Sequence, residues 1–275
     1  MRSLTIGFRA RGGFSGATGP CTEQRTVRVG AKSNPFGRAA SADPAEPFTL
    51  ALDATGFACS VVVSTGENVL ARERLVARHG QAERLLLMID DAIRRAGLLP
   101  SAVDLIGVVV GPGSYTGIRV SLSAARGIAL ATKAQLIGVT GFEATAANLV
   151  PSVITNGSFL LIALESRRED LFIQIFDRTG GPLLRARAVR PALLSATLSD
   201  AIGEAPLLVA GDAAERALSA LAPRPDTTAI ESSAPDAVGL LRAVLTHWRA
   251  GERGGKPLPL YLRAPDVTLP TVAKA

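Results

Sequence analysis

The chain has 275 residues, of which 47% are hydrophobic, and a formal net charge of +6 at pH 7. This length and composition exclude a largely disordered chain and fit either one large domain or two modest lobes. The two cysteines, Cys21 and Cys59, exclude a disulfide framework and a cysteine metal site, as expected in a reducing compartment. Every apolar run is interrupted by Gly, Thr, Lys or Arg before it reaches the length of a membrane span. We therefore expect a cytoplasmic protein without a membrane segment.

Most of the positive charge lies in residues 1–46. This segment holds seven basic and three acidic residues, a difference of +4, which leaves +2 for the rest of the chain. The rest is too close to neutral to predict a large nucleic-acid groove, although a small basic patch could help a partner to hold RNA. Residues 1–46 have no hydrophobic periodicity, and we predict an unpacked, disordered N-terminal extension. An arginine-rich leader resembles an organelle transit peptide, and a start site assigned too early is the explanation that we favour.

The first regular elements are three strands and an amphipathic helix. Apolar runs separated by turn residues predict strands at Phe48–Asp53, Ala58–Ser64 and Val69–Val76. Between Gln81 and Gly97, one side of a predicted helix gathers the apolar residues Leu85, Leu86, Met88, Ile89, Ala92, Ile93 and Ala96. Leu87 lies outside this stripe, among charged residues. The stripe is wide for a surface helix, and we expect part of it to contact a partner and part of it to be core.

A glycine-rich turn follows the next strand. The β-branched run Leu105–Val110 predicts a buried strand, and helical periodicity extends from Thr116 to about Lys133. Between them lies the sequence Gly111-Pro112-Gly113-Ser114-Tyr115-Thr116-Gly117. The free N–H groups at such a helix start can bind an anion, and the same glycines fit tight packing without a ligand equally well. The turn has neither the lysine of a Walker loop nor the spacing of a dinucleotide-binding loop.

The second half of the chain repeats this order of elements, with strands predicted at Phe159–Leu164, Leu171–Asp177 and Leu207–Gly211. The repeat predicts an internal duplication, and so two related α/β lobes with a cleft between them. We expect an extension at 1–46, a first lobe at 47–150, a second, smaller lobe at 151–263 and a tail at 264–275. The second lobe is expected to end with a helix at Pro235–Arg249 and a returning extended segment at Leu258–Leu262.

Each of the two repeated halves, here called modules, places an acidic residue at the end of its first strand. This residue is Asp53 in the first module and Glu165 in the second. Carboxylates between two lobes suit metal–nucleotide chemistry, and acidic residues at strand ends also hold turns by hydrogen bonding to the backbone. For Asp53 both interpretations stay open. For Glu165 we favour the turn, because Arg167 offers a neighbouring ion-pair partner. The two histidines, His79 and His247, are far apart in the sequence and do not predict a metal site.

Several of these segments together resemble the bacterial TsaB family. The resemblance is carried by Leu52-Asp53-Ala54-Thr55, by the 111–117 turn followed by Ile118-Arg119, by Glu165-Ser166-Arg167 and by Pro259-Leu260-Tyr261-Leu262-Arg263. It covers about residues 48 to 263. The resemblance implies the duplicated actin-like ATPase fold, which is ribonuclease H-like, with two lobes of mixed sheets flanked by helices. It also implies the dimerisation subunit of the machinery that makes threonylcarbamoyladenosine in tRNA.

The resemblance implies an accessory subunit rather than an enzyme. In the catalytic subunit, TsaD, a His-x-x-x-His metal pair follows the glycine-rich loop and its helix, and Gly141 and Thr145 stand at those positions here. Neither residue ligates a transition metal through nitrogen, so we expect no catalytic residue, no metal and no cofactor of its own. The implied partners are a TsaD-type catalytic subunit, a TsaE-type ATPase, a second copy of the chain, and tRNA through the complex. ATP or ADP would bind at the shared interface.

Two sets of residues are therefore candidates for function. The candidate nucleotide or interface loop comprises Asp53, Gly111, Gly113, Ser114 and Gly117. The candidate partner interface comprises the helix positions Leu85, Leu87, Ile89, Ile93, Thr116, Arg119, Ser123 and Gly127. The alternative function is an independent actin-like ATPase or a sugar-kinase-like phosphotransferase that uses Asp53 and the glycine-rich turn. A metal-dependent peptidase is more distant, because its ligands are missing.

Overall fold

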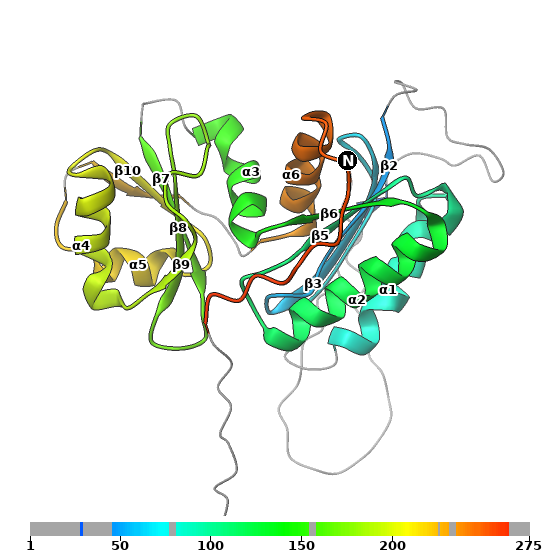
Figure 1. Ribbon diagram of the computed structural model, residues 1–275, viewed down its shortest axis with the longest axis horizontal. Coiled ribbons are helices and arrows are strands. Elements are labelled where there is room, and N and C mark those ends of the chain that lie inside the picture. The colour runs from blue at the N-terminus through cyan, green and yellow to red at the C-terminus, as the bar shows by residue number, and fades with distance from the viewer. Residues whose placement is uncertain are drawn as a thin grey trace, which may run out of the picture.

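The computed structural model describes residues 28–29, 46–76, 81–153, 158–224, 226–230 and 235–263, arranged as two lobes around two mixed sheets (Figure 1). The first sheet has the order β1-β4-β3-β2-β5-β6. Its strands are β1 (Arg28–Val29), β2 (Phe48–Asp53), β3 (Ala58–Thr65), β4 (Asn68–Val76), β5 (Leu105–Val109) and β6 (Gln135–Val139). The second sheet has the order β11-β10-β7-β8-β9. Its strands are β7 (Phe159–Glu165), β8 (Leu171–Phe176), β9 (Arg187–Val189), β10 (Leu207–Ala210) and β11 (Thr227–Ala229).

The two sheets repeat one topology. In each, three strands in sequence pair antiparallel, β2-β3-β4 and β7-β8-β9, and the next two strands, β5 and β6 or β10 and β11, extend the sheet in parallel from its first strand. Parallel neighbours need a crossover, and each module supplies it as a helix. The predicted duplication, and with it the duplicated α/β actin-like fold, is confirmed by this order.

The helices are α1 (Gln81–Arg95), α2 (Tyr115–Thr132), α3 (Gly141–Val153), α4 (Pro191–Ile202), α5 (Ala214–Ala220) and α6 (Ala237–Arg249), with a short 3-10 turn at Pro100–Ala102. Helices α1 and α2 bury their apolar sides on one face of the first sheet. Helices α4 and α5 do the same on the second sheet. Helices α3 and α6 lie between the two sheets in Figure 1. None of the described helices is long and apolar enough to cross a membrane.

The modules exchange their last helices. Helix α6, which ends the second module, packs its apolar side on the first sheet through residues such as Leu240 and Val244. Helix α3, which ends the first module, packs Phe142 and Leu149 against the second sheet. The two helices also touch each other, because Gly239 has no side chain and a Cβ there would overlap the carbonyl oxygen of Ala144. Each sheet is thus closed by a helix from the other half of the chain.

The segment that follows α6 runs along the first lobe and ends at the second. The backbone N–H of Gly255 donates to the carbonyl oxygen of Leu136, 3.2 Å away, and that of Leu260 donates to Val110 at 2.8 Å. Figure 1 shows this segment in red, passing below α6 toward the second sheet. The returning segment therefore docks on the first lobe and reaches across to the second.

Several predicted features fall on residues that the structure does not describe. Of the extension at 1–46, only Arg28–Val29 and Glu46 are described, and Arg28–Val29 pair antiparallel with β4. The tail at 264–275 and His79 lie outside the described residues. The predictions for these residues therefore stay predictions.

Candidate functional site

The glycine-rich turn packs directly on the turn that follows β2. The N–H of Ser114 donates to the carbonyl oxygen of Thr55 at 2.8 Å, and the Ser114 hydroxyl accepts from the N–H of Gly117 as the N-cap of α2. A Cβ at Gly113 would overlap the Thr55 carbonyl, and a Cβ at Gly117 would overlap that of Ala54. Gly113 also has a φ of 156°, which favours glycine. The space that these glycines leave open is occupied by the chain itself.

Asp53 lies behind this turn rather than in an open site. Its carboxylate accepts hydrogen bonds from the Thr55 N–H at 2.8 Å and from the Thr55 hydroxyl at 2.7 Å. The side chain is buried, with 2% of its surface exposed. Burial raises the pKa of Asp53 to about 6, although the two hydrogen bonds from Thr55 oppose this rise. The geometry is that of an acidic residue holding a turn by backbone hydrogen bonding.

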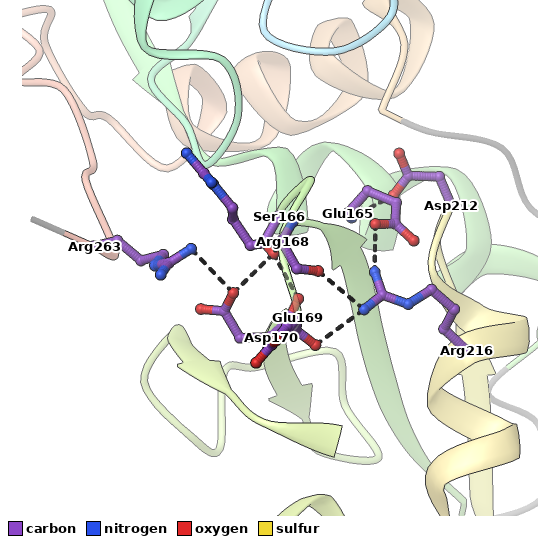
Figure 2. Close-up of polar contacts among 8 residues, drawn as sticks. All are labelled: Glu165, Ser166, Arg168, Glu169, Asp170, Asp212, Arg216 and Arg263. Atoms are coloured by element: carbon purple, nitrogen blue, oxygen red, sulfur yellow. Dashed lines mark hydrogen bonds and ion pairs between the residues drawn. The ribbon is translucent and has the colours of Figure 1, made fainter. Parts of the chain in front are cut away.

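The corresponding acidic residue of the second module has a different environment, shown in Figure 2. Glu165 forms an ion pair with Arg216 of α5, at 2.6 Å between Oε2 and Nη1. Arg216 also donates to the carbonyl oxygens of Arg168 and Glu169, so one guanidinium holds the whole turn after β7. The carboxylate of Asp212 accepts from the Glu165 N–H at 2.9 Å. Sequence reasoning missed Arg216, because it is 51 positions from Glu165 and only the fold brings them together.

Arg167, the partner expected for Glu165, instead reaches the other lobe. Its guanidinium lies over the Phe57 ring, 4.3 Å from the centroid, and donates to the Gly56 carbonyl oxygen at 3.1 Å. Phe57 is half exposed in the turn between β2 and β3. The ion pair predicted between Arg167 and Glu165 is therefore wrong, and Arg167 connects the lobes across the mouth of the cleft.

The cleft itself has a volume of about 420 Å³. Its lining comes from both lobes and includes Gly113, Ser114, Arg167, Arg263 and Asp212. Of the candidate loop, Asp53, Gly111 and Gly117 do not line it. The pKa of Asp212 is raised, chiefly by burial. The cleft thus collects arginines and two carboxylates, Glu165 and Asp212, which already accept hydrogen bonds from other parts of the chain.

The returning C-terminal segment forms one wall of the cleft. The Tyr261 ring lies 5.2 Å from that of Tyr115, and its hydroxyl accepts from Nε of Arg119 at 3.2 Å. The Arg119 guanidinium also lies 3.9 Å from the centre of the Tyr115 ring. At the end of the segment, Arg263 pairs with Asp170 at 3.2 Å, as Figure 2 shows. Tyr115 is therefore shared between the cleft and the surface of α2.

A second concave surface lies between α1 and α2, with a volume of about 720 Å³. The structure brings five of the predicted interface residues to this groove, namely Leu85, Thr116, Arg119, Ser123 and Gly127. Apart from the neighbouring residues and backbone of α2 itself, no atom of the described residues lies within 4 Å of where a Cβ on Gly127 would be, so this part of α2 is open. The groove is therefore a surface on which a helix could approach α2 closely.

The predicted interface positions on α1 divide into core and surface. Leu85, Ile89 and Ile93 are buried in the core that α1 forms with the first sheet, where the helix packs against β3 and β4. Leu86 and Leu87 are exposed, by 60% and 65% of their surfaces. Leu87 was predicted to lie off the apolar stripe, whereas Leu86 was assigned to it. The exposed leucines of α1 are thus Leu86, which lines the groove, and Leu87, which does not.

The positions aligned with the metal pair lie at the start of α3. The N–H of Gly141 donates to the carbonyl oxygen of Gly111 at 2.8 Å, and the buried Thr145 hydroxyl donates to the carbonyl oxygen of Gly141. Within the described residues, no three side chains of His, Cys, Asp or Glu form a group that could hold a metal ion. His247 contacts Glu143 and Glu252 instead.

Comparison with known proteins gives a consistent set of relatives. Residues 74–181 match the family model described as TsaD: tRNA N6-adenosine threonylcarbamoyltransferase. An uncharacterized protein of Mycobacterium tuberculosis is 30% identical over 221 residues, which cover 79% of this chain and 92% of that protein. The tRNA threonylcarbamoyladenosine biosynthesis protein TsaB of Haemophilus influenzae is 36% identical over 98 residues, or 35% of this chain and 41% of that one. The solved structure of YeaZ from Pseudomonas aeruginosa superimposes with a TM-score of 0.65 at 25% identity, over 78% of this chain and all of that chain.

Proposed function

The chain belongs to the TsaB family, and from this membership we propose that it is a noncatalytic subunit required for threonylcarbamoyl transfer to the tRNA adenosine next to the anticodon. Its relatives named TsaB are proteins of tRNA threonylcarbamoyladenosine biosynthesis, which places this chain in that pathway. In the proposal it binds a TsaD-type catalytic subunit and supports that enzyme during transfer.

The groove between α1 and α2 is the observation that carries this proposal. Exposed leucines are costly in water, and a concave surface with an apolar edge is typical of a protein contact. Leu86 lines this groove together with the small residues Ser123 and Gly127 of α2, which allow a partner helix close approach. Leu87, the next residue of α1, is exposed outside the groove lining. We therefore assign the TsaD-type subunit to this groove. A second copy of the chain would use the same surface in a homodimer.

The polar geometry supports a noncatalytic role. Asp53 is buried and accepts hydrogen bonds from Thr55, and Glu165 is paired with Arg216. Backbone atoms fill the space beside Gly113 and Gly117, where a phosphate would otherwise approach the loop. These contacts leave no free carboxylate in the positions expected for metal-assisted phosphoryl transfer.

The same contacts favour a nucleotide site shared with a partner over one in this chain's own cleft. We assign ATP or ADP to the interface between this chain and the TsaD-type subunit. A TsaE-type ATPase would dock on that pair, and tRNA would bind to the complex.

The proposal is tested by co-purification and by reconstitution of tRNA modification. Replacing Leu86 and Leu87 by Glu places one charge in the groove and one beside it on α1. Burying them in an interface costs several kcal/mol, about a hundredfold or more in affinity. The matched control is Leu193→Glu on α4, because Leu193 is also exposed, by 57%, but lies in the second lobe. The proposal is supported if the double variant, but not the control, fails to co-purify with the TsaD-type subunit and fails to support tRNA modification. Complex formation by a folded double variant would show that this groove is not the contact.

The alternative is an independent ATPase or sugar-kinase-like phosphotransferase acting through Asp53 and the 111–117 turn. Purified chain should then hydrolyse ATP or phosphorylate a sugar without a partner. We expect negligible turnover, and we expect Gly141→His with Thr145→His to create none, because the surrounding ligand-orienting groups are also absent. Turnover by the pure chain that Asp53→Ala abolishes would replace the accessory role by this alternative.

A further inference from the structure

One edge of the second lobe carries a run of arginines with no acidic residue among them. Residues 178–199 contain Arg178, Arg185, Arg187 and Arg190 and no Asp or Glu. The described part of the second lobe is otherwise mixed in charge, with acidic residues before and after this run, at Asp177 and Asp200. A run of positively charged residues on a lobe of mixed charge is a local feature that the net charge of the chain does not reveal.

The fold places these arginines along one border of the second sheet. Arg178 lies in the turn after β8, Arg187 is the first residue of β9, and Arg190 precedes α4. Among the described strands, β9 is at the edge of the sheet and pairs with β8. All four arginines are exposed. At about 3.3 Å per residue, Arg185 to Arg190 span roughly 16 Å of extended chain.

These charges are not neutralised by the described part of the protein. None of the four forms a salt bridge there, in contrast to Arg216 and Arg263 of the same region, which pair with carboxylates. The nearest acidic residue in sequence, Asp177, accepts hydrogen bonds from the Thr179 N–H and hydroxyl and from the Gly181 N–H. Its carboxylate is therefore held within its own turn.

From this border we propose that the chain contacts tRNA directly, binding the phosphate backbone through Arg185, Arg187 and Arg190. The inference rests on the proposed function, which brings this chain to tRNA together with a catalytic subunit. A guanidinium presents a planar set of donors that matches phosphate, and fixed phosphate charges supply the compensation that the lobe lacks. The contact is to the backbone, so it carries no base sequence preference.

A protein with an acidic surface is the competing occupant, and protection of the sheet edge from pairing with another strand is the competing role. Charged side chains on an edge strand do discourage such pairing. Edge protection needs charge at β9 itself, whereas three arginines continuing to the start of α4 extend beyond the paired strand. We therefore favour the tRNA phosphate backbone.

The test uses the full chain in complex with the TsaD-type subunit and an unmodified tRNA transcript, with binding followed by fluorescence anisotropy at about 0.1 M salt. The triple variant Arg185→Gln, Arg187→Gln, Arg190→Gln should raise the Kd about tenfold or more. The slope of log affinity against log salt should become shallower by about two, since each phosphate contact contributes roughly 0.7 to 0.9. The corresponding triple Lys variant should keep most of the affinity, because it keeps the charges.

The matched control removes three charges from exposed positions elsewhere, by Arg94→Gln, Arg253→Gln and Lys256→Gln. This control should bind tRNA within about twofold of the wild type, since a contact depends on local rather than net charge. Unchanged affinity of the arginine variant, or an equal loss in the control, would overturn the proposal. The proposal would also be overturned if the arginine variant kept its tRNA affinity but lost a protein partner in gel filtration. Self-association of the arginine variant with unchanged tRNA affinity would overturn it as well.

The proposed function has its own readout in the same preparations. A wild-type chain that neither binds the TsaD-type subunit nor supports tRNA modification contradicts the proposed function, whatever the tRNA affinity is. A wild-type chain that does both, alongside an arginine variant with unchanged tRNA affinity, contradicts only the direct contact.

Discussion

The two modules share one topology but differ at the corresponding ends of their first strands. In the first module, Asp53 is buried and its carboxylate accepts hydrogen bonds from Thr55, two residues further on. In the second, Glu165 is partly exposed and pairs with Arg216, which comes from a distant helix. The first solution is local and closes the site with its own backbone. The second depends on a long-range ion pair and leaves arginines facing the cleft.

The helices of the two modules also differ, in this case in length. The first module has α1 and α2, of 15 and 18 residues, with a groove between them, and the second has α4 and α5, of 12 and 7 residues. Longer helices provide a surface large enough for a partner. We infer that duplication allowed the modules to specialise, with the first presenting an apolar groove and the second presenting charge.

The largest expected effect comes from the contact that closes the first module. Gly117→Ala would force a methyl group into the Ala54 carbonyl oxygen, which neither backbone can avoid without moving. We expect a loss of about 3 kcal/mol or more in the free energy of unfolding, measured by urea denaturation. Gly127→Ala is the control on the same helix, because no described residue outside the local stretch of α2 comes within 4 Å of the added group. It should gain up to about 1 kcal/mol. Equal stability of the two variants would contradict the tight packing.

The buried carboxylate of the first module gives the next largest effect. The pKa of Asp53 is raised to about 6 in the folded protein, above 3.8 when it is unfolded. The folded state therefore binds the proton more tightly, and its stability falls as pH rises from about 4 to 6. Asp53→Asn removes this dependence and keeps an oxygen for the Thr55 hydrogen bonds. At pH 7 the variant should be more stable by about 2 kcal/mol, an order-of-magnitude value from the shift.

Urea denaturation at several pH values between 4 and 7 measures this difference. Asp177→Asn is the control from the second lobe. Hydrogen bonds, first from the Thr179 hydroxyl, lower the pKa of Asp177, so its contribution is present above pH 3.8 and is lost as pH falls. Between pH 4 and 7 the wild type should therefore keep a nearly constant advantage over Asp177→Asn, whereas Asp53→Asn should become more stable than the wild type as pH rises. A pH-independent difference between wild type and Asp53→Asn would contradict the raised pKa.

Local sequence patterns were sufficient for most strands and for the two long helices of the first module. The strand Phe48–Asp53 was predicted with its observed bounds, and the helix predicted from Thr116 begins at Tyr115. These elements have strong periodicity and are bounded by glycine turns, which are local signals. Strands β9 and β11 have three residues each and were missed, because so short a run has no periodicity.

The candidate site was less predictable, because its contacts are between residues far apart in sequence. The turn at 111–117 was located from sequence, but whether its glycines face a ligand or the chain depends on Ala54 and Thr55, more than 50 positions away. The pairing of Arg216 with Glu165 likewise needs the fold. The stripe on α1 is mostly core, but it also included Leu86, which is exposed. Leu85, Ile89 and Ile93, predicted as partner interface, are buried.

The ion pair of the second module should have a moderate effect. Arg216→Gln leaves the Glu165 carboxylate without its cation and removes the hydrogen bonds to two carbonyl oxygens of the turn (Figure 2). Both side chains are partly exposed, so we expect a loss of about 1 kcal/mol in urea denaturation. Arg94→Gln removes a guanidinium that pairs with Asp90 and Asp91 on the exposed side of α1, and it should cost less than about 0.5 kcal/mol. Equal losses in the free energy of unfolding for the two variants would mean that Arg216 contributes no more to stability than an ordinary surface ion pair.

The smallest effect concerns the place where the modules exchange their last helices. His247 of α6 lies between Glu252, 2.7 Å from Nδ1, and Glu143 of α3, 3.5 Å from Nε2. Hydrogen bonding to Glu143, and then to Glu252, raises the pKa of His247 from 6.5 to about 9. A raised pKa means that the charged imidazole is favoured in the folded protein. Its stabilisation is therefore complete below pH 6.5 and is lost as pH rises to about 9.

His247→Gln should remove this dependence and leave the helices in contact through Gly239 and Ala144. The ring is partly exposed, so solvent screening limits the effect to less than about 1 kcal/mol. The measurement is the difference in thermal unfolding midpoint between wild type and variant at pH 6 and at pH 9.5. Glu252→Gln, which keeps the contact to α3, should show part of the same change. A wild-type advantage that is equal at both pH values would mean that packing alone, without this charge, joins the exchanged helices.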